Sequence, residues 1–464
     1  MIPLIHHPSP QGLLHKELAT FAQTTLEQKI VAVRYDWSPN YLKRGETEVL
    51  VAVFCLVRQG EQVRIGLGVF ADHHGVQELT SLTETSSALI SWLAERQTPF
   101  FWLDQPIELQ PIHIPKPWGQ EIWFTGIEER GQSRVTDGRY SIPLPWLLSA
   151  CGECCLAKQS NNGKTFDATP ILLKTLDPLP EPVFGDLYFE LHEEKREVYV
   201  VTHIDQQAWP GGEGGIRFGF SVEKRDEFPD DTHFKKAYLA SVKKYRVIRE
   251  QIDELVDGFR VEEGIGVNEP VSANQSKQWL AKLPAELLRE EQALREDMES
   301  FIHVQSLQLG DVVKVPTLTP HSLMHGVRTI EFQTPVYERK ILSFAQKVLT
   351  QSHWDTDAAM QLADLSPATI PDLALIHEKD GCSIESVVEF QDFSVERICL
   401  QPSATFSLPL DHSYRLLITV SSGICIDGSQ RPSEQAELLP AGTGPLLISN
   451  TSASEAVFLL AKPH

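Results

Sequence analysis

Two carboxylates and an imidazole stand close together in GDLYFELHEEKREVYVV (185–201). Glu190 and His192 alternate with Leu191, so on a strand their side chains point to the same face. A short EEKR turn follows, and the next strand begins at Glu197. This spacing predicts three side chains that converge across a β-hairpin. Alternating charges are also common on the solvated face of a strand, so the pattern alone does not establish a site.

A fourth candidate ligand lies more than a hundred residues further along the chain. In GDVVKVPTLTPHSLMHG (310–326), His321 follows a strand and a proline-rich turn. Two carboxylates and two imidazoles suit a borderline divalent ion, of which Zn²⁺, Mn²⁺, Fe²⁺ and Ni²⁺ are the common biological examples. We therefore expect Glu190, His192, Glu197 and His321 to hold one divalent metal.

These two segments resemble the paired metal motifs of cupin β-barrels. Gly310, Pro316 and His321 reproduce the spacing G-x5-P-x-G-x2-H, with Leu318 at the position where glycine is usual. The 190–197 segment resembles the other motif, H-x-H-x(3,4)-E, with glutamate in place of its first histidine. The resemblance implies a double-stranded β-helix barrel that closes around the metal.

Further segments resemble the type I phosphomannose isomerases, a cupin family with a long helical insertion between the two motifs. They are KPWGQEIW (116–123), TPILLKTLDP (169–178), KREVYVV (195–201) and TPHSLMHGVRTIEFQ (319–333). The resemblance covers about residues 111–464. It implies a metal-dependent isomerase that converts mannose 6-phosphate to fructose 6-phosphate, with Zn²⁺ as the expected ion.

Carried over position by position, the family's Gln, His, Glu and His ligands fall on Glu190, His192, Glu197 and His321. Glu190 is a departure that adds a negative charge where the family has glutamine.

The resemblance also implies a set of substrate-binding groups. Lys195 and Lys174 match family lysines that line the sugar-phosphate pocket. Arg339 is the nearest equivalent of the family's pocket arginine, although its spacing from Glu331 is shorter by two and the usual Ser-Asp pair is absent.

An aldose–ketose isomerase moves a proton between C1 and C2 through an enediol, so it needs a base and cations that grip the phosphate. Lys195, Lys174 and Arg339 could supply those cations. Glu331 and a metal-bound hydroxide both remain candidates for the base. Two other functions stay open: a non-catalytic cupin that binds or senses a sugar or sugar phosphate, and an Fe²⁺ oxygenase, because two histidines and a carboxylate also suit non-haem iron.

The rest of the chain predicts a mainly β protein with α insertions and three domains. Residues 1–110 predict an α+β domain, with a helix over 12–32, a strand pair over 46–57 and 61–70, and a helix over 82–97. Residues 111–370 predict the metal-binding cupin domain, with helices at about 226–305. Residues 371–464 predict a degenerate, metal-free cupin barrel, because Pro445 occupies its histidine position.

Composition excludes several classes of partner. The 464 residues carry a formal net charge of −22, which disfavours nucleic acid and anionic membranes because both bind basic surfaces. No apolar run reaches the ~20 residues of a membrane-spanning helix, and the N-terminus lacks a secretion signal. The seven cysteines predict reduced thiols in a cytoplasmic protein. The expected partner is a small sugar phosphate, and the oligomeric state stays open.

Overall fold

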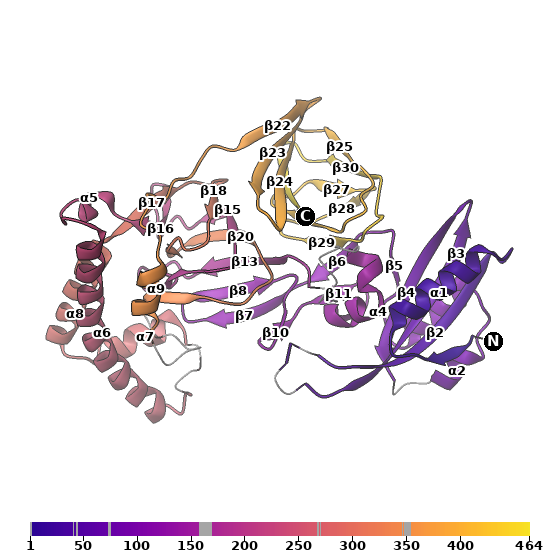
Figure 1. Ribbon diagram of the computed structural model, residues 1–464, viewed down its shortest axis with the longest axis horizontal. Helices are drawn as coiled ribbons and strands as arrows, with labels where there is room; N and C mark the ends of the chain where they lie inside the picture. Colours follow the sequence, from indigo (N-terminus) through magenta and orange to yellow (C-terminus); the bar gives the residue numbers. More distant parts are fainter. Residues whose placement is uncertain are drawn as a thin grey trace. The chain divides into compact units, whose positions relative to one another are not determined.

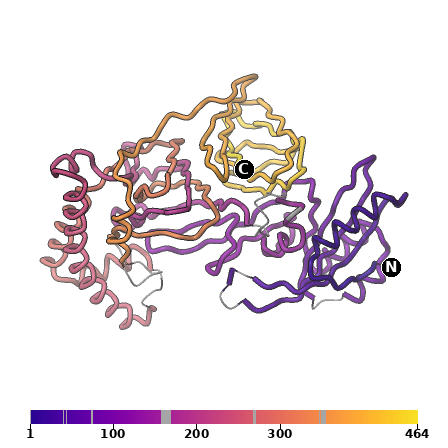
Figure 2. Tube along the Cα trace, viewed as in Figure 1, coloured from indigo at the N-terminus to yellow at the C-terminus, as the bar shows by residue number. Residues whose placement is uncertain are grey.

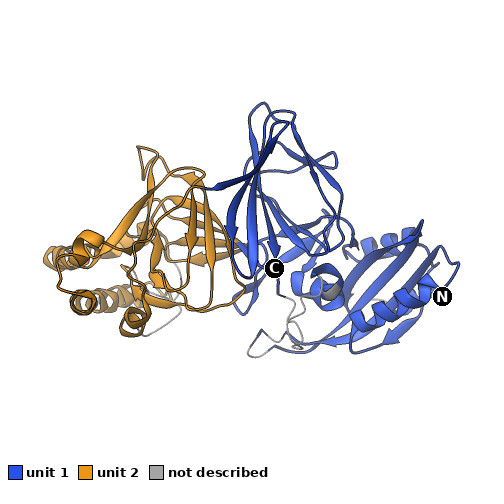
Figure 3. Ribbon diagram, turned by 45° about the horizontal axis from the view of Figure 1, so that its top comes forward, with its two compact units in different colours: residues 1–112, 123–173, 373–464 blue, residues 113–122, 174–372 orange. Residues whose placement is uncertain are grey.

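The computed structural model describes residues 2–39, 41–42, 45–72, 76–156, 169–266, 269, 271–345, 347 and 354–464. The chain divides into two compact units (Figure 3). Unit 1 contains residues 1–112, 123–173 and 373–464, and unit 2 contains residues 113–122 and 174–372. The division into three domains at 110 and 370 stays a prediction. No described helix combines the length and the apolar character that a membrane span requires.

The N-terminal part of unit 1 is a five-stranded sheet with helices. Its strands, in spatial order, are β1 (Leu4–His6), β2 (Gln28–Trp37), β3 (Glu48–Gln59), β4 (Gln62–Ala71) and β5 (Phe101–Trp102). Its helices are α1 (Pro10–Ala22), α2 (Val76–Thr80) and α3 (Ser86–Glu95). The predicted strand pair is confirmed as the antiparallel pair of β3 and β4. The predicted helix over 12–32 is too long: it ends at Ala22, and residues from Gln28 onward form β2.

The remainder of the described part of unit 1 contains two larger sheets, a two-stranded sheet of β9 (Ile127–Glu128) and β10 (Gly131–Gln132), and the helix α4 (Leu144–Leu156). The nine-stranded sheet runs β12 (Ser141–Pro143), β11 (Arg134–Thr136), β6 (Ile107–Gln110), β29 (Ala436–Leu439), β26 (Arg415–Thr419), β31 (Ala456–Pro463), β24 (Phe393–Leu400), β23 (Cys382–Glu389) and β22 (Ala374–Lys379). The four-stranded sheet runs β25 (Thr405–Leu408), β30 (Leu446–Asn450), β27 (Ile424–Ile426) and β28 (Ser429–Gln430). Buried residues of both sheets, among them Leu417, Phe458 and Ile448, share one hydrophobic cluster. That this region is a second, degenerate cupin barrel stays a prediction.

Unit 2 is built around two sheets whose apolar faces form a common core. The six-stranded sheet runs β18 (Val312–Val315), β15 (Glu197–Ile204), β20 (Val327–Gln333), β13 (Leu172–Pro178), β8 (Gly119–Trp123) and β7 (Ile112–Lys116). The five-stranded sheet runs β17 (Ile302–Leu307), β16 (Gly214–Phe220), β19 (His321–Leu323), β14 (Phe189–Leu191) and β21 (Lys340–Ser343). Val201 and Val313 of the first sheet lie in the same buried cluster as Phe218 and Ile341 of the second.

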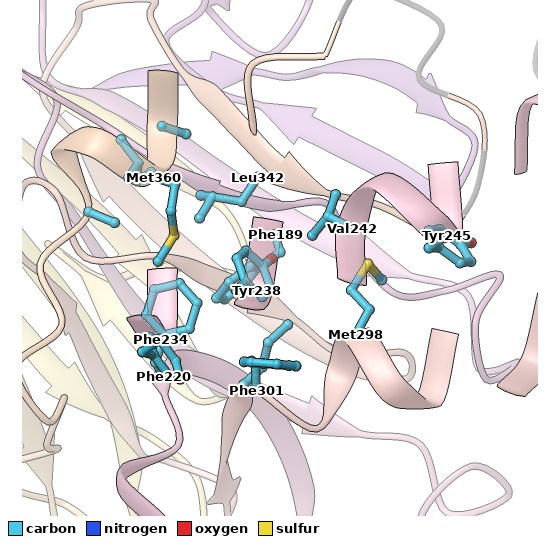
Figure 4. Packing of buried hydrophobic residues seen from close by; sticks show 14 of the residues in the cluster. Phe189, Phe220, Phe234, Tyr238, Val242, Tyr245, Met298, Phe301, Leu342 and Met360 are labelled. Atoms are coloured by element: carbon cyan, nitrogen blue, oxygen red, sulfur yellow. The ribbon is translucent and has the colours of Figure 1, made fainter. Parts of the chain in front are cut away.

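Helices cover the outer face of the five-stranded sheet (Figures 1 and 2). They are α5 (Val222–Arg225), α6 (Asp231–Glu262), α7 (Ala273–Leu280), α8 (Ala285–Glu299) and α9 (Thr356–Leu362). Along α6 the residues Phe234, Tyr238, Val242 and Tyr245 recur at helical spacing and are buried. Phe234 and Tyr238 contact Phe220 at the end of β16, and all four share a buried cluster with residues of β14 and β21 (Figure 4). The chain is therefore mainly β with helical insertions, as the sequence predicts.

Candidate functional site

The four predicted ligands come from both sheets of unit 2. Glu190 on β14 and His321 on β19 are directly opposite each other in the five-stranded sheet. Glu197 begins β15 in the six-stranded sheet, where it lies opposite Gln333. The predicted hairpin is wrong, because β14 and β15 do not pair and residues 193–196 cross from one sheet to the other. Alternation along a strand reveals which side chains share a face, but it does not reveal which strands are neighbours.

The crossing segment is held in place by Glu338. One carboxylate oxygen, Oε1 of Glu338, accepts hydrogen bonds from the backbone N–H groups of Glu193, Glu194 and Lys195, at 2.9, 3.1 and 3.1 Å. The carbonyl oxygen of the same residue lies 2.9 Å from Nδ1 of His192. Glu338 therefore fixes both ends of the short connection between the two sheets.

Three of the predicted ligands form a buried cluster. Oε2 of Glu197 lies 3.0 Å from Nε2 of His321 and 3.4 Å from Nε2 of His192. One ligand atom from each of the three residues lies within 4.8 Å of the others. All three side chains are at most 3% exposed. Two imidazoles and one carboxylate therefore converge on a single point between the sheets.

The hydrogen bonds of the two histidines fit a bound cation. Nδ1 of His192 faces the carbonyl of Glu338, and Nδ1 of His321 faces the carbonyl of Thr319 at 3.1 Å. A carbonyl oxygen only accepts, so each Nδ1 carries the proton in the neutral ring and each Nε2 is left with a lone pair. Both lone pairs then face the carboxylate of Glu197, and Nε2 of His192 has no hydrogen-bond partner among the described residues. A divalent ion would satisfy all three groups.

The electrostatics of the cluster favour the protonation states that metal ligands need. Burial lowers the pKa of His192, and this outweighs the opposite effect of the Glu197 charge. Burial alone would raise the pKa of Glu197, but the positive charge of Lys195 holds it well below its usual value. A neutral imidazole and an ionised carboxylate are the forms that coordinate metal.

Glu197 is oriented by two more side chains. Nζ of Lys195 lies 2.6 Å from Oε1 of Glu197, and the hydroxyl of Tyr199 donates to Oε2 at 2.8 Å. Tyr199 is two residues beyond Glu197 on β15, so its side chain lies on the same face. The sequence analysis missed Tyr199, although this alternation could have indicated it.

Glu190 lies at the edge of the cluster and contacts Arg339. Its Oε1 is 3.8 Å from Nε2 of His192, and its Oε2 is 3.4 Å from Nη1 of Arg339. Arg339 precedes β21 and also lies over the ring of Tyr188, 5.4 Å from its centroid. The structure therefore brings Glu190 and Arg339 to the site, where they form an ion pair with each other.

Lys174 and Glu331 form a second buried group on the inner face of the six-stranded sheet. Nζ of Lys174 lies 3.2 Å from Oε2 of Glu331 and 4.0 Å from Oε1 of Glu121. The other oxygen of Glu121, Oε2, lies 3.2 Å from Nζ of Lys116. Glu331 is 1% exposed, and neither carboxylate oxygen makes a well-directed hydrogen bond within the described residues. Burial raises the pKa of Glu331 well above its usual value, although the Lys174 charge acts in the opposite direction.

Glu331 is linked to the cluster of His192, Glu197 and His321 through its strand. It lies directly opposite Tyr199 in the pairing of β20 with β15. The pair of Gln333 and Glu197 lies two residues away along the same two strands. Lys174, Lys195 and Arg339 each contact a different carboxylate, on Glu331, Glu197 and Glu190 respectively. The sequence analysis missed Glu121 and Lys116, which lie in the 116–123 segment that carries part of the family resemblance.

A buried ionic network anchors the two segments that carry the ligands of the five-stranded sheet. Asp186, which precedes β14, accepts from the backbone N–H of His325 at 2.9 Å and lies 2.7 Å from its Nδ1. Nη2 of Arg217 on β16 donates to Asp186 at 2.9 Å and to Glu299 at 3.0 Å. His325 follows β19, so this network fixes the start of β14 against the end of β19.

Comparisons with known proteins identify the fold. The chain is similar to the crystal structure of mannose 6-phosphate isomerase from Bacillus subtilis, with a TM-score of 0.50 and 14% identity over 77% of this chain and 99% of that one. It is also similar to a variant of phosphomannose isomerase from Salmonella typhimurium, with a TM-score of 0.50 and 13% identity over 77% and 99%. No protein-family model and no curated protein sequence matches the chain. About three quarters of the chain therefore has a fold similar to that of these two isomerases.

Proposed function

We propose that the chain is a metal-dependent aldose–ketose isomerase of sugar phosphates, and that it interconverts mannose 6-phosphate and fructose 6-phosphate. The observation that carries this proposal is the buried cluster of His192, Glu197 and His321, whose lone pairs and charge face one point. The similarity of the fold to mannose 6-phosphate isomerases supports the choice of reaction. Both the substrates and the residue roles given below belong to the proposal.

In this proposal His192, Glu197 and His321 hold the divalent ion, and Glu190 completes the set of four. Zn²⁺ is the expected ion because imidazole and carboxylate together suit it, and Mn²⁺, Fe²⁺ and Ni²⁺ are the alternatives. When bound, the ion supplies a Lewis acid that stabilises negative charge on the oxygens at C1 and C2. Lys195 and Tyr199 keep Glu197 oriented.

Glu331 is the proposed proton carrier. The reaction removes the proton from C2 of the aldose, forms an enediol, and returns a proton to C1 of the ketose. A carboxyl group whose pKa is raised toward neutrality accepts and returns a proton most effectively, and burial raises the pKa of Glu331. Lys174 at 3.2 Å stabilises the ionised form of Glu331, so the pair can exist in both protonation states during turnover.

Lys174, Lys195 and Arg339 are the proposed cationic groups of the phosphate pocket. Each side chain is less than one-fifth exposed, so its charge is only weakly screened by water. A phosphate dianion would compete with the carboxylates that these cations contact, and it would bind through charge-assisted hydrogen bonds.

The ion pair of Glu190 with Arg339 favours one alternative function. If Arg339 stays with Glu190 when a sugar phosphate binds, the pocket arginine cannot move to the substrate. The chain would then be a metal-containing cupin that binds or senses a sugar or sugar phosphate without turning it over.

An isomerase assay in deuterated water tests the proposal. The metal-replete protein is incubated with mannose 6-phosphate, and formation of fructose 6-phosphate is followed together with deuterium at C1. We expect product that carries deuterium, because the proton that the base holds at the enediol stage can exchange with deuterium from the solvent before it is returned to C1. Glu331→Gln should abolish both signals, whereas Glu213→Gln, which changes an exposed glutamate on the same unit, should leave them unchanged.

The alternatives give different results in the same experiment. Binding of mannose 6-phosphate without product supports the sensing function and contradicts the isomerase. A product that forms only in air, and not under anaerobic conditions, indicates oxygenase chemistry and also contradicts it. The cytoplasmic location and a partner limited to small sugar phosphates are part of the same proposal.

A further inference from the structure

Unit 2 contains a cavity of about 240 Å³ among its helices. It is lined by residues of α6, α7 and α8 and of the loop at 182–184, and none of the residues proposed above for the metal or the sugar phosphate lines it. Most of its wall is apolar and includes Phe184, Ile252, Val256, Leu280 and Leu288. The cavity therefore shares no lining residue with the group of residues proposed for the active site.

Three of the four cations that line this cavity have their own carboxylate partners. Arg249 lies 2.6 Å from Asp253, Arg295 lies 3.2 Å from Glu291, and Lys347 lies 2.7 Å from Asp257. A cation that is paired in this way has little net charge to offer a ligand.

Arg260 is the cation without a close carboxylate. Its residue is 6% exposed, and its guanidinium lies over the ring of Trp279, 5.2 Å from the centroid. Among the described residues, its Nη1 donates to the backbone carbonyls of Gly266 and Glu269, at 3.1 and 2.7 Å. Nε of Arg260 has no hydrogen-bond partner within the described parts of the chain. The carboxylate oxygen paired with Arg260 is Oδ1 of Asp257, which lies 4.0 Å from Nε of Arg260. Lys347 already donates a hydrogen bond to this oxygen.

The electrostatic state of Arg260 agrees with this geometry. Burial lowers the pKa of Arg260, and the more distant charges of Asp257, Asp253 and Glu269 do not fully offset the effect. A buried guanidinium with incomplete neutralisation and an unpaired N–H is costly unless an anion joins it.

We propose that this cavity binds a small organic acid that has one carboxylate and an apolar body. The carboxylate would pair with Arg260, and the apolar body would fill the space lined by Val256, Leu280 and Leu288. Since a water occupies about 30 Å³ in the liquid, the cavity has room for on the order of eight to ten non-hydrogen atoms. This binding activity does not depend on the proposed isomerase reaction.

Titration calorimetry with benzoate as the probe tests the proposal on the full, metal-replete chain. Benzamide has the same shape without the charge, and inorganic phosphate has charge without the apolar body. We expect benzoate to bind at least about tenfold more tightly than either, a difference of ~1.4 kcal/mol. Equal binding of benzamide, or an absence of benzoate binding up to millimolar concentration, would overturn the proposal.

Four variants assign the binding to this cavity. Arg260→Gln removes the guanidinium, and Leu288→Trp fills the cavity without changing any charge, which keeps the test informative if the first variant is unstable. Both should weaken benzoate binding at least about tenfold. Arg246→Gln changes an exposed arginine on the same helix and should have no effect. His321→Ala should also bind benzoate normally, and a loss of binding there would place benzoate at the metal centre and refute the proposal.

Discussion

Replacement of Asp186 by asparagine should loosen the framework of the candidate site. Asp186 is 5% exposed, and its carboxylate contacts Arg217 and both the backbone and the ring of His325. Removal of one partner from a buried ion pair costs about 3–5 kcal/mol, because the other charge stays buried. Arg217 keeps Glu299 at 3.0 Å, so we expect the lower end, about 3 kcal/mol.

Thermal and urea unfolding measure this loss. Unit 2 has roughly 200 residues, for which each kcal/mol lowers Tm by about 2–4 °C, so Asp186→Asn should lower the unfolding midpoint by about 6–12 °C. The urea m-value should stay the same, because the fold is retained. Glu250→Gln is the matched control, since its ion pair with Arg246 is about half exposed and is worth less than about 0.5 kcal/mol.

The loss of stability caused by Asp186→Asn should also depend on pH, and it should become smaller in acid. Burial alone would raise the pKa of Asp186, but the hydrogen bond with His325 and the charge of Arg217 hold it well below its usual value. A carboxyl group with a lowered folded-state pKa contributes stability above its unfolded pKa and loses it as the pH falls through the folded value. The difference in the free energy of unfolding between the wild type and Asp186→Asn should therefore be constant above about pH 5 and shrink in stronger acid. A loss below about 1 kcal/mol at neutral pH would refute the reasoning.

Three further predictions concern the proposed metal and substrate groups. Removal of divalent metal by a chelator should lower the unfolding midpoint of the protein, because an ion present at a thousand times its Kd stabilises the folded state by about 4 kcal/mol. Differential scanning fluorimetry measures this midpoint, and an unchanged value would contradict a metal site. His321→Ala should lose bound metal, and unchanged metal content by elemental analysis would mean that the ligand assignment is wrong. Lys174→Met should lower kcat/KM for mannose 6-phosphate about 10- to 150-fold, the value of one charge-assisted hydrogen bond, with a smaller change in metal content; unaltered kinetics would remove Lys174 from the substrate pocket.

Much of unit 2 could be predicted because its pattern is local. The helical spacing of Phe234, Tyr238, Val242 and Tyr245 gives α6 directly. The alternation around His192 identifies side chains that share a face. These features depend only on residues a few positions apart, so one sequence contains them.

Long-range pairing could not be predicted in the same way. The 185–201 segment predicts a hairpin, yet Glu197 enters the opposite sheet, because strand neighbours are chosen by packing across the whole unit. The short apolar run after Gln28 fits a helix and a strand equally well in isolation, and its pairing with β3 decides for the strand. The ion pair of Glu190 with Arg339 joins residues 149 positions apart, so its existence depends on the fold.

The placement of β6 constrains how the protein can be made in a cell. This strand, at Ile107–Gln110, has β11 on one side and β29, at Ala436–Leu439, on the other. A ribosome adds residues in order, so more than three hundred residues must be translated after β6 before its second neighbour exists. All five strands of the β1 to β5 sheet lie at or before Trp102, so their pairing can form early, whereas one edge of β6 waits until the last part of the chain has emerged. Nascent chains that are stalled before residue 436 should therefore expose that edge to chaperones.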